Sequence, residues 1–306
     1  MGKKKKNKKS IFDVIGDTIK NEVIDPVVDV VEDVVDVVVD VVEEVVDFVE
    51  EVNPFYQNGG DGDDNLSIYV AGVANGNGGN DKLKAYGISV KLNGGSGNDR
   101  LYAYAAHAEL NGGSGNDKLY AYTAHAELNG GSGDDYIEGN SASNKIDGGS
   151  GNDIIRANGA YNNVKGGDDN DDIQTRGGYN YINGGNGNDT IEAYGVANEI
   201  HGGDGNDNIK AWGGLNAIIS GTGDDNILGV GAANVFVDHG GNDKMYGVAG
   251  GNIFVDTGNG NDEMHAVGGL NILTKVGNGN TTMVAGGTYN VLTKVGDGND
   301  LMIALA

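Results

Sequence analysis

The residues best suited to chemistry in this sequence are aspartates that end glycine-rich turns. The turn GGSGND at 94–99 is one of a series that recurs with a step of 17 residues once, then 18 nine times, then 19. Thr281 stands at the one place in the series where the aspartate is missing. The aspartates of this series, which we predict to be metal ligands, are Asp64, Asp81, Asp99, Asp117, Asp135, Asp153, Asp171, Asp189, Asp207, Asp225, Asp243, Asp262 and Asp300.

A metal ion is expected at these turns for an electrostatic reason. If the repeats stack as strands of one sheet, successive aspartates lie about 4.8 Å apart, and like charges at that spacing repel strongly away from bulk water. Ca²⁺ removes the repulsion because it accepts about six to eight oxygen ligands, carboxylates and backbone carbonyls alike. The glycines allow a positive φ, which turns carbonyl groups inward. Mg²⁺ fits less well, since it keeps its waters and requires an octahedral shell.

The elements that position these turns follow from the 18-residue repeat, which divides into two halves, each a turn and a short strand. In the first half, Leu101 and Ala103 are two residues apart and share the inward face of a strand, while Tyr102 and Tyr104 face outward. In the second half, Leu110 is the inward residue. Two inward columns make a flattened coil with a core two side chains thick. The chain is therefore predicted to be all-β, a parallel solenoid of about 13 coils of 17–19 residues over 58–306.

The opposite edge of each coil carries a turn that ends in asparagine. Stacked amides can hydrogen-bond along a column, as they do in cross-β ladders, so we interpret these residues as structural. Val90, Ala108 and Ala126 stand at the same place in the first coils. The asparagines of this column are Asn144, Asn162, Asn180, Asn198, Asn216, Asn234, Asn252, Asn271 and Asn290.

Two other columns have side chains that could meet a ligand. His107 and His125 are 18 residues apart and could hold Zn²⁺, but their nearly duplicated flanks favour a copied repeat. The outward column Tyr86, Tyr104 and Tyr122 could stack on sugar rings. Mutual support between neighbouring rings on one sheet face is the favoured interpretation.

The first 57 residues have a different character. Residues 1–26 comprise a basic tail and a short helix with apolar periodicity that ends at Pro26. In 27–52 the acidic residues form two series with a step of seven between valines, which predicts an amphipathic α-helix with a narrow acidic stripe. This helix could cap or pack against the solenoid, associate with copies of itself, or lie on a membrane. Residues 53–57 are interpreted as a linker.

The composition excludes several classes of protein. The 306 residues include 56 glycines but no cysteine, so a disulfide framework and a thiolate metal site are excluded. The formal net charge of −25 argues against nucleic acid as a partner and suits divalent cations. A hydrophobic share of 38% is low for a large globular core but sufficient for a thin, one-dimensional one. No apolar run is long enough for a transmembrane helix, and no standard signal peptide is present.

The glycine-rich turns resemble the G-G-x-G-x-D-x-U-x nonapeptide of RTX (repeats-in-toxin) calcium-binding proteins. The motif recurs in register over about 240 residues. This resemblance implies a right-handed parallel β-roll or β-helix with Ca²⁺ as its cofactor. It also implies type I secretion without a signal peptide, to the extracellular space or the cell surface. Its further partners would be a host cell surface, a glycan or a membrane.

A narrower resemblance concerns the last repeats. Residues 274–279 (TKVGNG) and 293–298 (TKVGDG) are similar to the T-x-V-G-x-G repeats near the start of large multifunctional autoprocessing RTX toxins. With a repeat cut short at Ala306, this predicts that the chain is an N-terminal piece of a longer protein in which the solenoid continues. We expect ion binding to be impaired where the turns depart from the motif, at Asn77, Asp169, Asp238-His239 and Thr281.

The sequence favours one function over two alternatives. It has no phosphate-binding loop and no nucleophile elbow, and we expect it not to be an enzyme. The favoured function is a calcium-folded RTX segment of an exported bacterial toxin or giant surface protein. The alternatives are a carbohydrate- or surface-binding adhesin module and an accessory repeat module of a secreted polysaccharide-modifying enzyme.

Overall fold

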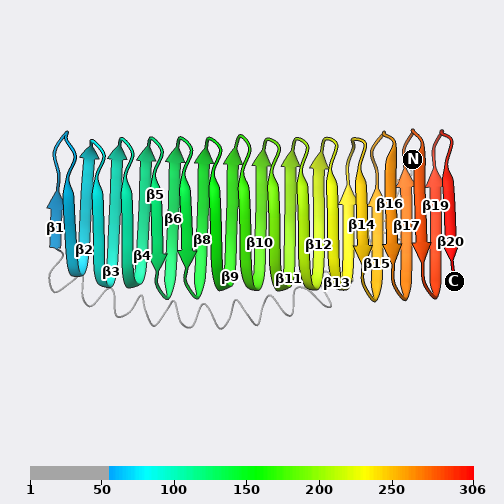
Figure 1. The fold of residues 1–306 in the computed structure, drawn as a ribbon, viewed down its shortest axis with the longest axis horizontal. Helices are drawn as coiled ribbons and strands as arrows, with labels where there is room; N and C mark the ends of the chain where they lie inside the picture. Colours follow the sequence, from blue (N-terminus) through cyan, green and yellow to red (C-terminus); the bar gives the residue numbers. More distant parts are fainter. Residues whose placement is uncertain (1–54) are drawn as a thin grey trace, which may run out of the picture.

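The computed structural model describes residues 55–306, which form a single parallel β-solenoid (Figure 1). The chain winds through about 14 turns, and each strand pairs in parallel with its equivalents one turn before and one turn after. The predicted all-β class is therefore confirmed. The helices predicted in 1–26 and 27–52 lie outside the described residues. The first strand begins at Phe55, so the solenoid starts inside the predicted linker 53–57.

Eight long strands pass round the asparagine edge without a break. In these strands the inward positions shift by one residue at the corner, from Leu101 and Ala103 in the first half to Ala108 and Leu110 in the second, while the parallel pairing with the neighbouring coil continues. These strands are β2 (Asn65–Gly78), β3 (Lys82–Ser96), β4 (Arg100–Ser114), β9 (Ile154–Asp168), β10 (Asp172–Asn186), β11 (Thr190–Asp204), β12 (Asn208–Thr222) and β13 (Asn226–Asp238).

In the other coils the strand is interrupted at the asparagine edge, and each half is a separate short strand. The short strands are β1 (Phe55–Asn58), β5 (Lys118–Tyr122), β6 (His125–Ser132), β7 (Tyr136–Asn140), β8 (Ser143–Ser150), β14 (Lys244–Val248), β15 (Gly251–Asp256), β16 (Asp262–Val267), β17 (Leu270–Val276), β18 (Thr281–Gly286), β19 (Tyr289–Val295) and β20 (Leu301–Leu305).

The unequal repeat lengths have local structural causes. The single 17-residue step coincides with a break in register between β2 and β3 at Val70/Ala71, and Val70 has a φ of 102°. The 19-residue steps begin where the glycine-rich turn gains one residue, since Asp256 and Asp262 are six positions apart where Asp238 and Asp243 are five apart. The strands on either side of the longer turn keep their parallel pairing.

The core consists of the two inward columns that the repeat predicted. Leu101, Ala103 and Leu110 are buried, as are their equivalents along the solenoid. A large side chain in one inward column faces a small residue in the other. A Cβ on Gly229 would lie 2.5 Å from Cζ of Phe236, so the larger ring of one column faces a glycine of the other.

The asparagine edge is a continuous hydrogen-bonded ladder, which confirms its structural interpretation. From Asn144 to Asn290, each side-chain Nδ2 donates to the Oδ1 of the next asparagine at 2.7–2.9 Å. The amides are almost fully buried as far as Asn271, where unpaired polar groups would be costly. Stacking of the coils thus pairs these amides with each other, and only Oδ1 of Asn144, at the start of the ladder, is buried without a partner among the asparagines of this edge.

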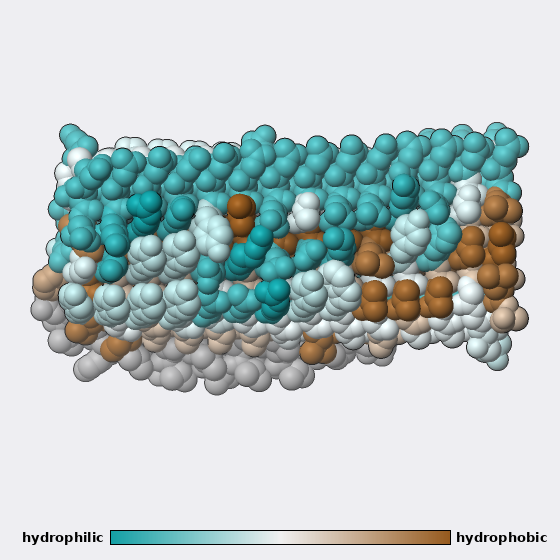
Figure 2. Space-filling model, viewed as in Figure 1, coloured by the Kyte–Doolittle hydropathy of each residue, from teal (hydrophilic) through white to brown (hydrophobic). Residues whose placement is uncertain are grey.

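The surface differs between the long sides and the end of the solenoid. The upper edge in Figure 2 is hydrophilic, whereas apolar side chains gather at the end that carries the last strands. These include Val295 on β19 and Leu301 on β20, which are 58% and 54% exposed. Within residues 55–306, no helix has the length and apolarity to cross a lipid bilayer.

Candidate metal centre at the glycine–aspartate edge

The predicted metal ligands form one column along the edge opposite the asparagine ladder, where the loops lie at the top of Figure 1. We call these residues the aspartate column. Each follows a glycine-rich turn and directly precedes or begins the next strand. From Asp81 to Asp243 they are only 1–3% exposed, whereas Asp64 is half-buried and Asp300 is exposed. The structure thus brings all thirteen residues into one line, with the ends open to solvent.

One oxygen of each buried carboxylate is used to join successive coils. The backbone N–H of Asp81 donates to Oδ1 of Asp99 at 2.7 Å, and that of Asp99 donates to Oδ1 of Asp117 at 2.7 Å. The same bond recurs at every coil as far as Asp262. Each carboxylate is therefore held in a fixed orientation by the coil before it.

The second oxygen of these carboxylates is buried and has no hydrogen-bond partner. A buried charged oxygen without a partner is costly, and native structures rarely tolerate one unless an ion or water completes it. Here the deficit recurs ten times in one line. The ten atoms are Oδ2 of Asp81, Asp99, Asp117, Asp135, Asp153, Asp171, Asp189, Asp207, Asp225 and Asp243.

A second oxygen lies near eight of these unpartnered atoms, those of Asp81 to Asp207. A Cβ added to Gly94 would overlap with Oδ2 of Asp99 and lie 2.5 Å from the carbonyl oxygen of Gly112 on the next coil. The same relation holds for Gly148, whose added Cβ would overlap with Asp153 Oδ2 and lie 2.5 Å from the Gly166 carbonyl. The first glycine of the turn therefore leaves a space towards which a carboxylate and a carbonyl converge. This all-oxygen donor set fits Ca²⁺.

Burial also perturbs the acidity of the column. Desolvation raises the pKa of Asp135 to about 7, although the N–H bond from Asp117 lowers it, and the neighbouring carboxylates of Asp117 and Asp153 raise it further. The pKa of Asp171 rises to about 8 for the same reasons. Without a cation, the aspartate column would therefore hold protons near neutral pH. A bound cation would keep the carboxylates ionised.

Comparison with known families agrees with this geometry. The family model of the RTX calcium-binding nonapeptide repeat matches residues 75–107, 91–119, 108–123, 127–163, 165–198, 193–227 and 219–254, which together span more than half of the chain. The chain belongs to the RTX repeat family. No curated protein and no solved structure matches it.

The RTX turns contain a second ladder that the sequence reasoning missed. The residue before each column aspartate is asparagine or aspartate, and its Oδ1 accepts the backbone N–H of the equivalent residue one coil later. Asn116 N–H donates to Asn98 Oδ1 at 2.7 Å, and Asn206 N–H donates to Asn188 Oδ1 at 2.7 Å. The signal was the constant Asn/Asp identity at this position. These exposed side chains fix the turn and leave the column aspartate free to face inward.

Towards the C-terminal end, the first position of the RTX turn changes character. We call this line of residues the first-position column. Asp238 pairs with Asp256, Asp256 with Lys275, and Lys275 with Lys294 in the parallel register. From the first coil to the last, the column is Gly59, Gly76, Gly94, Gly112, Gly130, Gly148, Gly166, Gly184, Gly202, Ser220, Asp238, Asp256, Lys275 and Lys294.

Lys275 brings a positive charge into the buried edge of the RTX solenoid. Its Nζ donates to Asp256 Oδ2 at 2.7 Å and also to Asp262 Oδ2, and all three side chains are fully buried. Burial alone would lower the pKa of Lys275, but its bonds to Asp256 and Asp262 raise it above the ordinary value. At Asp262 an ammonium group therefore stands where the earlier coils present an unpartnered oxygen.

The last coil repeats this arrangement near its exposed end. Lys294 Nζ donates to the carbonyl oxygen of Gly279 at 2.8 Å and to Asp300 Oδ1 at 3.2 Å. The intervening turn has Thr281 in place of a carboxylate, and Thr281 N–H donates to Asp300 Oδ1. Lysine thus accompanies the departure from the RTX motif, which the sequence had indicated only as a loss of ligands.

Two other departures from the RTX motif give the turn a strained backbone but leave the aspartate column intact. Asn77 and Asp169 replace turn glycines and both have a φ of 76°, a left-handed conformation that asparagine and aspartate adopt more readily than other residues. The neighbouring Asp81 and Asp171 keep their buried, unpartnered Oδ2 atoms. The donor set survives at both turns.

The aromatic and histidine columns are stacks of neighbouring side chains. The ring centroids of Tyr86 and Tyr104 are 5.3 Å apart and those of Tyr104 and Tyr122 are 5.2 Å apart, and both pairs of rings are nearly parallel. The predicted mutual support is confirmed, and these stacked faces are covered by each other. His107 and His125 also stack, with ring centroids 5.1 Å apart.

Proposed function

We propose that this chain is a calcium-binding RTX segment of an exported bacterial protein, a toxin or a giant surface protein, and that Ca²⁺ makes its aspartate column stack. The observation that carries the proposal is the line of ten buried Oδ2 atoms without partners. Successive carboxylates one coil apart, about 4.8 Å, would repel each other by roughly 3 kcal/mol at an effective dielectric constant near 20. A divalent ion between coils removes this repulsion.

The residues that would hold the ion are the column aspartate and the first turn glycine of the adjoining coil, such as Asp99 Oδ2 and the Gly112 carbonyl. Extracellular calcium modules bind at about 10⁻⁴–10⁻³ M, and binding to a site that exists only in the fold contributes to folding free energy. The chain would then stay loose where Ca²⁺ is scarce and fold after export. The proposal gives the chain no catalytic role.

A pair of adjacent residues tests this proposal. Asp135 is buried in the column with its Oδ2 unpartnered, whereas Asp134 is exposed and accepts hydrogen bonds from Asn152. Asp135→Asn should raise the Ca²⁺ concentration needed for β-structure and lower the number of ions bound. Asp134→Asn removes the same charge, but asparagine occupies that position in neighbouring coils, so its calcium titration should match the parent chain.

The titration is followed by circular dichroism, with bound Ca²⁺ counted by equilibrium dialysis. The parent chain should be largely unordered with a chelator and β-rich in millimolar Ca²⁺. A β-spectrum that ignores the chelator, or equal behaviour of Asp135→Asn and Asp134→Asn, would contradict the proposal.

A further inference from the structure

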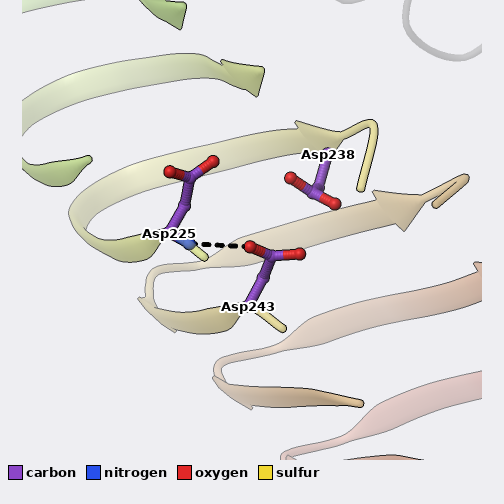
Figure 3. A group of neighbouring side chains, drawn as sticks. All are labelled: Asp225, Asp238 and Asp243. Carbon is purple, nitrogen blue, oxygen red and sulfur yellow. Dashed lines mark hydrogen bonds between the residues drawn. The ribbon is translucent and has the colours of Figure 1, made fainter. Parts of the chain in front are cut away.

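Three carboxylates meet where the first-position column changes from small residues to charged ones. One oxygen each from Asp225, Asp238 and Asp243 lies within 4.8 Å of the others, and all three residues are buried (Figure 3). Two oxygens that bind one Ca²⁺ at about 2.3–2.6 Å can be at most about 5 Å apart. The three side chains are therefore close enough to share one ion.

The cluster arises because two columns converge. Asp225 and Asp243 belong to the aspartate column on successive coils, and Asp238 is the last residue of β13 in the first-position column. In nine earlier coils this position is glycine, which can contribute only backbone. The departure that the sequence reasoning expected to impair ion binding thus adds a carboxylate to the site.

The surrounding groups orient these carboxylates but do not neutralise them. Ser220 Oγ donates to Asp238 Oδ1 at 2.6 Å, and the Gly240 N–H donates to Asp238 Oδ2 at 2.9 Å. The Oδ2 atoms of Asp225 and Asp243 are buried and have no partner. No lysine, arginine or histidine among residues 55–306 forms an ion pair with any of the three.

The next coil shows what such a cluster requires. Asp256 and Asp262 occupy the same two columns as Asp238 and Asp243, and the ammonium group of Lys275 lies between them. The chain supplies its own cation there. One coil earlier, the equivalent carboxylates of Asp238 and Asp243 lie close to that of Asp225, and no ammonium group of the described residues lies between them.

We propose that Asp225, Asp238 and Asp243 form a three-carboxylate divalent-cation site within the aspartate column, and that this site binds Ca²⁺ more tightly than the glycine-type turns. The donors are all oxygen, which selects Ca²⁺ or a similar hard ion over Zn²⁺. Affinity of calcium sites rises with the number of charged ligands, and three carboxylates here replace the single carboxylate and carbonyl that converge at turns such as Gly94. This inference rests on the proposed calcium function, because Asp225 and Asp243 come together only when successive coils stack.

The test counts bound Ca²⁺ at low free concentration. The full chain is folded in Ca²⁺ and dialysed against buffers of decreasing free Ca²⁺, with bound ion measured by atomic absorption. One ion should remain at free Ca²⁺ at least ~10-fold below that which empties the other sites. Asp238→Gly, which restores the glycine of earlier coils, should lose this ion and keep the rest. Asp204→Asn, an exposed aspartate in a glycine-type turn, should retain it.

Asp238→Ser provides a second variant with the residue that Ser220 already places in this column, so folding does not rest on one substitution. Retention of the tight ion by both Asp238 variants, or no tighter ion in the parent chain, would overturn the proposal. The outcomes separate it from the general calcium function: binding of a single ion in total supports this site alone, and binding of weak ions without a tight one supports only the glycine-type turns.

Discussion

The coils from Gly76 to Ile209 and the coils from Asp256 to Asp300 have the same backbone arrangement, but only the second region has lysines beside its column carboxylates. In the first region the first-position column is glycine and the buried Oδ2 atoms are unpartnered. In the second region Lys275 and Lys294 reach the carboxylates of Asp262 and Asp300. The difference between the two regions supports the proposal that stacked acidic turns are neutralised by a cation, either a Ca²⁺ ion from solvent or a lysine of the chain.

The largest expected difference appears when Ca²⁺ is removed. Each site filled at tenfold excess over its Kd adds about 1.4 kcal/mol, so the coils of the first region together should lose on the order of 10 kcal/mol. The second region should keep its ammonium–carboxylate contacts. Hydrogen exchange with mass spectrometry in chelator should show fast exchange over residues 76–209 and slower exchange over 262–300. Uniform exchange along the chain would remove the distinction.

Removal of the internal cation should have the next largest effect. Lys275→Met leaves Asp256 and Asp262 buried without their partner, and breaking a buried ion pair typically costs about 3–5 kcal/mol. Denaturant unfolding of the Ca²⁺-loaded chain, followed by hydrogen exchange over 256–300, measures this loss. Lys244→Met is the control, because Lys244 is exposed and outside both columns. Equal stability of the two variants would show that Lys275 does not hold this region together.

Acid should partly replace Ca²⁺ in the first region. Burial raises the pKa of Asp117 and Asp207 to about 7 and that of Asp171 to about 8, above the unfolded value of about 3.9. The folded chain therefore binds protons that the unfolded chain releases, and this stability is full below about pH 4 and is lost as the pH rises through 6 to 8.

The measurement is circular dichroism of the metal-free chain between pH 5 and pH 8. β-structure should be greater at pH 5, and the difference should disappear in saturating Ca²⁺, which keeps the carboxylates ionised. A metal-free chain that gains β-structure as the pH rises would have the wrong sign for a buried, unneutralised aspartate column.

The smallest difference between the regions is expected at the asparagine ladder, which runs from Asn144 in the first region to Asn290 in the second. Asn198→Ala and Asn271→Ala each remove one rung and leave buried amide groups unpaired, at a cost of about 1–3 kcal/mol. The two losses should be similar and should not depend on Ca²⁺ beyond its effect on overall stability. Thermal unfolding in Ca²⁺ compares them. A loss at only one of these positions would mean that the asparagine ladder, too, differs between the regions.

The sequence predicted most of the fold because its information is periodic. The 18-residue step placed the aspartate column, the inward pair Leu101/Ala103 and the asparagine ladder on separate lines, since a parallel solenoid repeats each position one strand spacing further on. The structure added the continuous strands round the asparagine edge and the bulge at Val70. These depend on bend geometry, which the residue pattern does not encode.

The roles of Asp238 and Lys275 could not be read from the motif alone. Both depart from a consensus, and a consensus indicates only that a ligand is missing. Their meaning depends on register: Asp238 stacks with Asp256, and Asp256 with Lys275 across a 19-residue step. Alignment of the repeats on their first glycine, rather than on their last aspartate, would have shown a column that changes from neutral to acidic to basic.

The asparagine ladder has a polarity along the axis of the rod. Every side-chain bond from Asn144 to Asn290 runs in the same direction, and the second amide hydrogen of Asn162 and Asn180 is held by the carbonyls of Arg176 and Tyr194 on the following coil. If a single amide flipped, its NH₂ group would face the NH₂ group of the preceding asparagine, and its oxygen would face the oxygen of the following one. The carboxamide dipoles are therefore parallel and add along the rod axis, with the positive end towards the later coils. To reverse the direction of the ladder, every amide in the line would have to flip together.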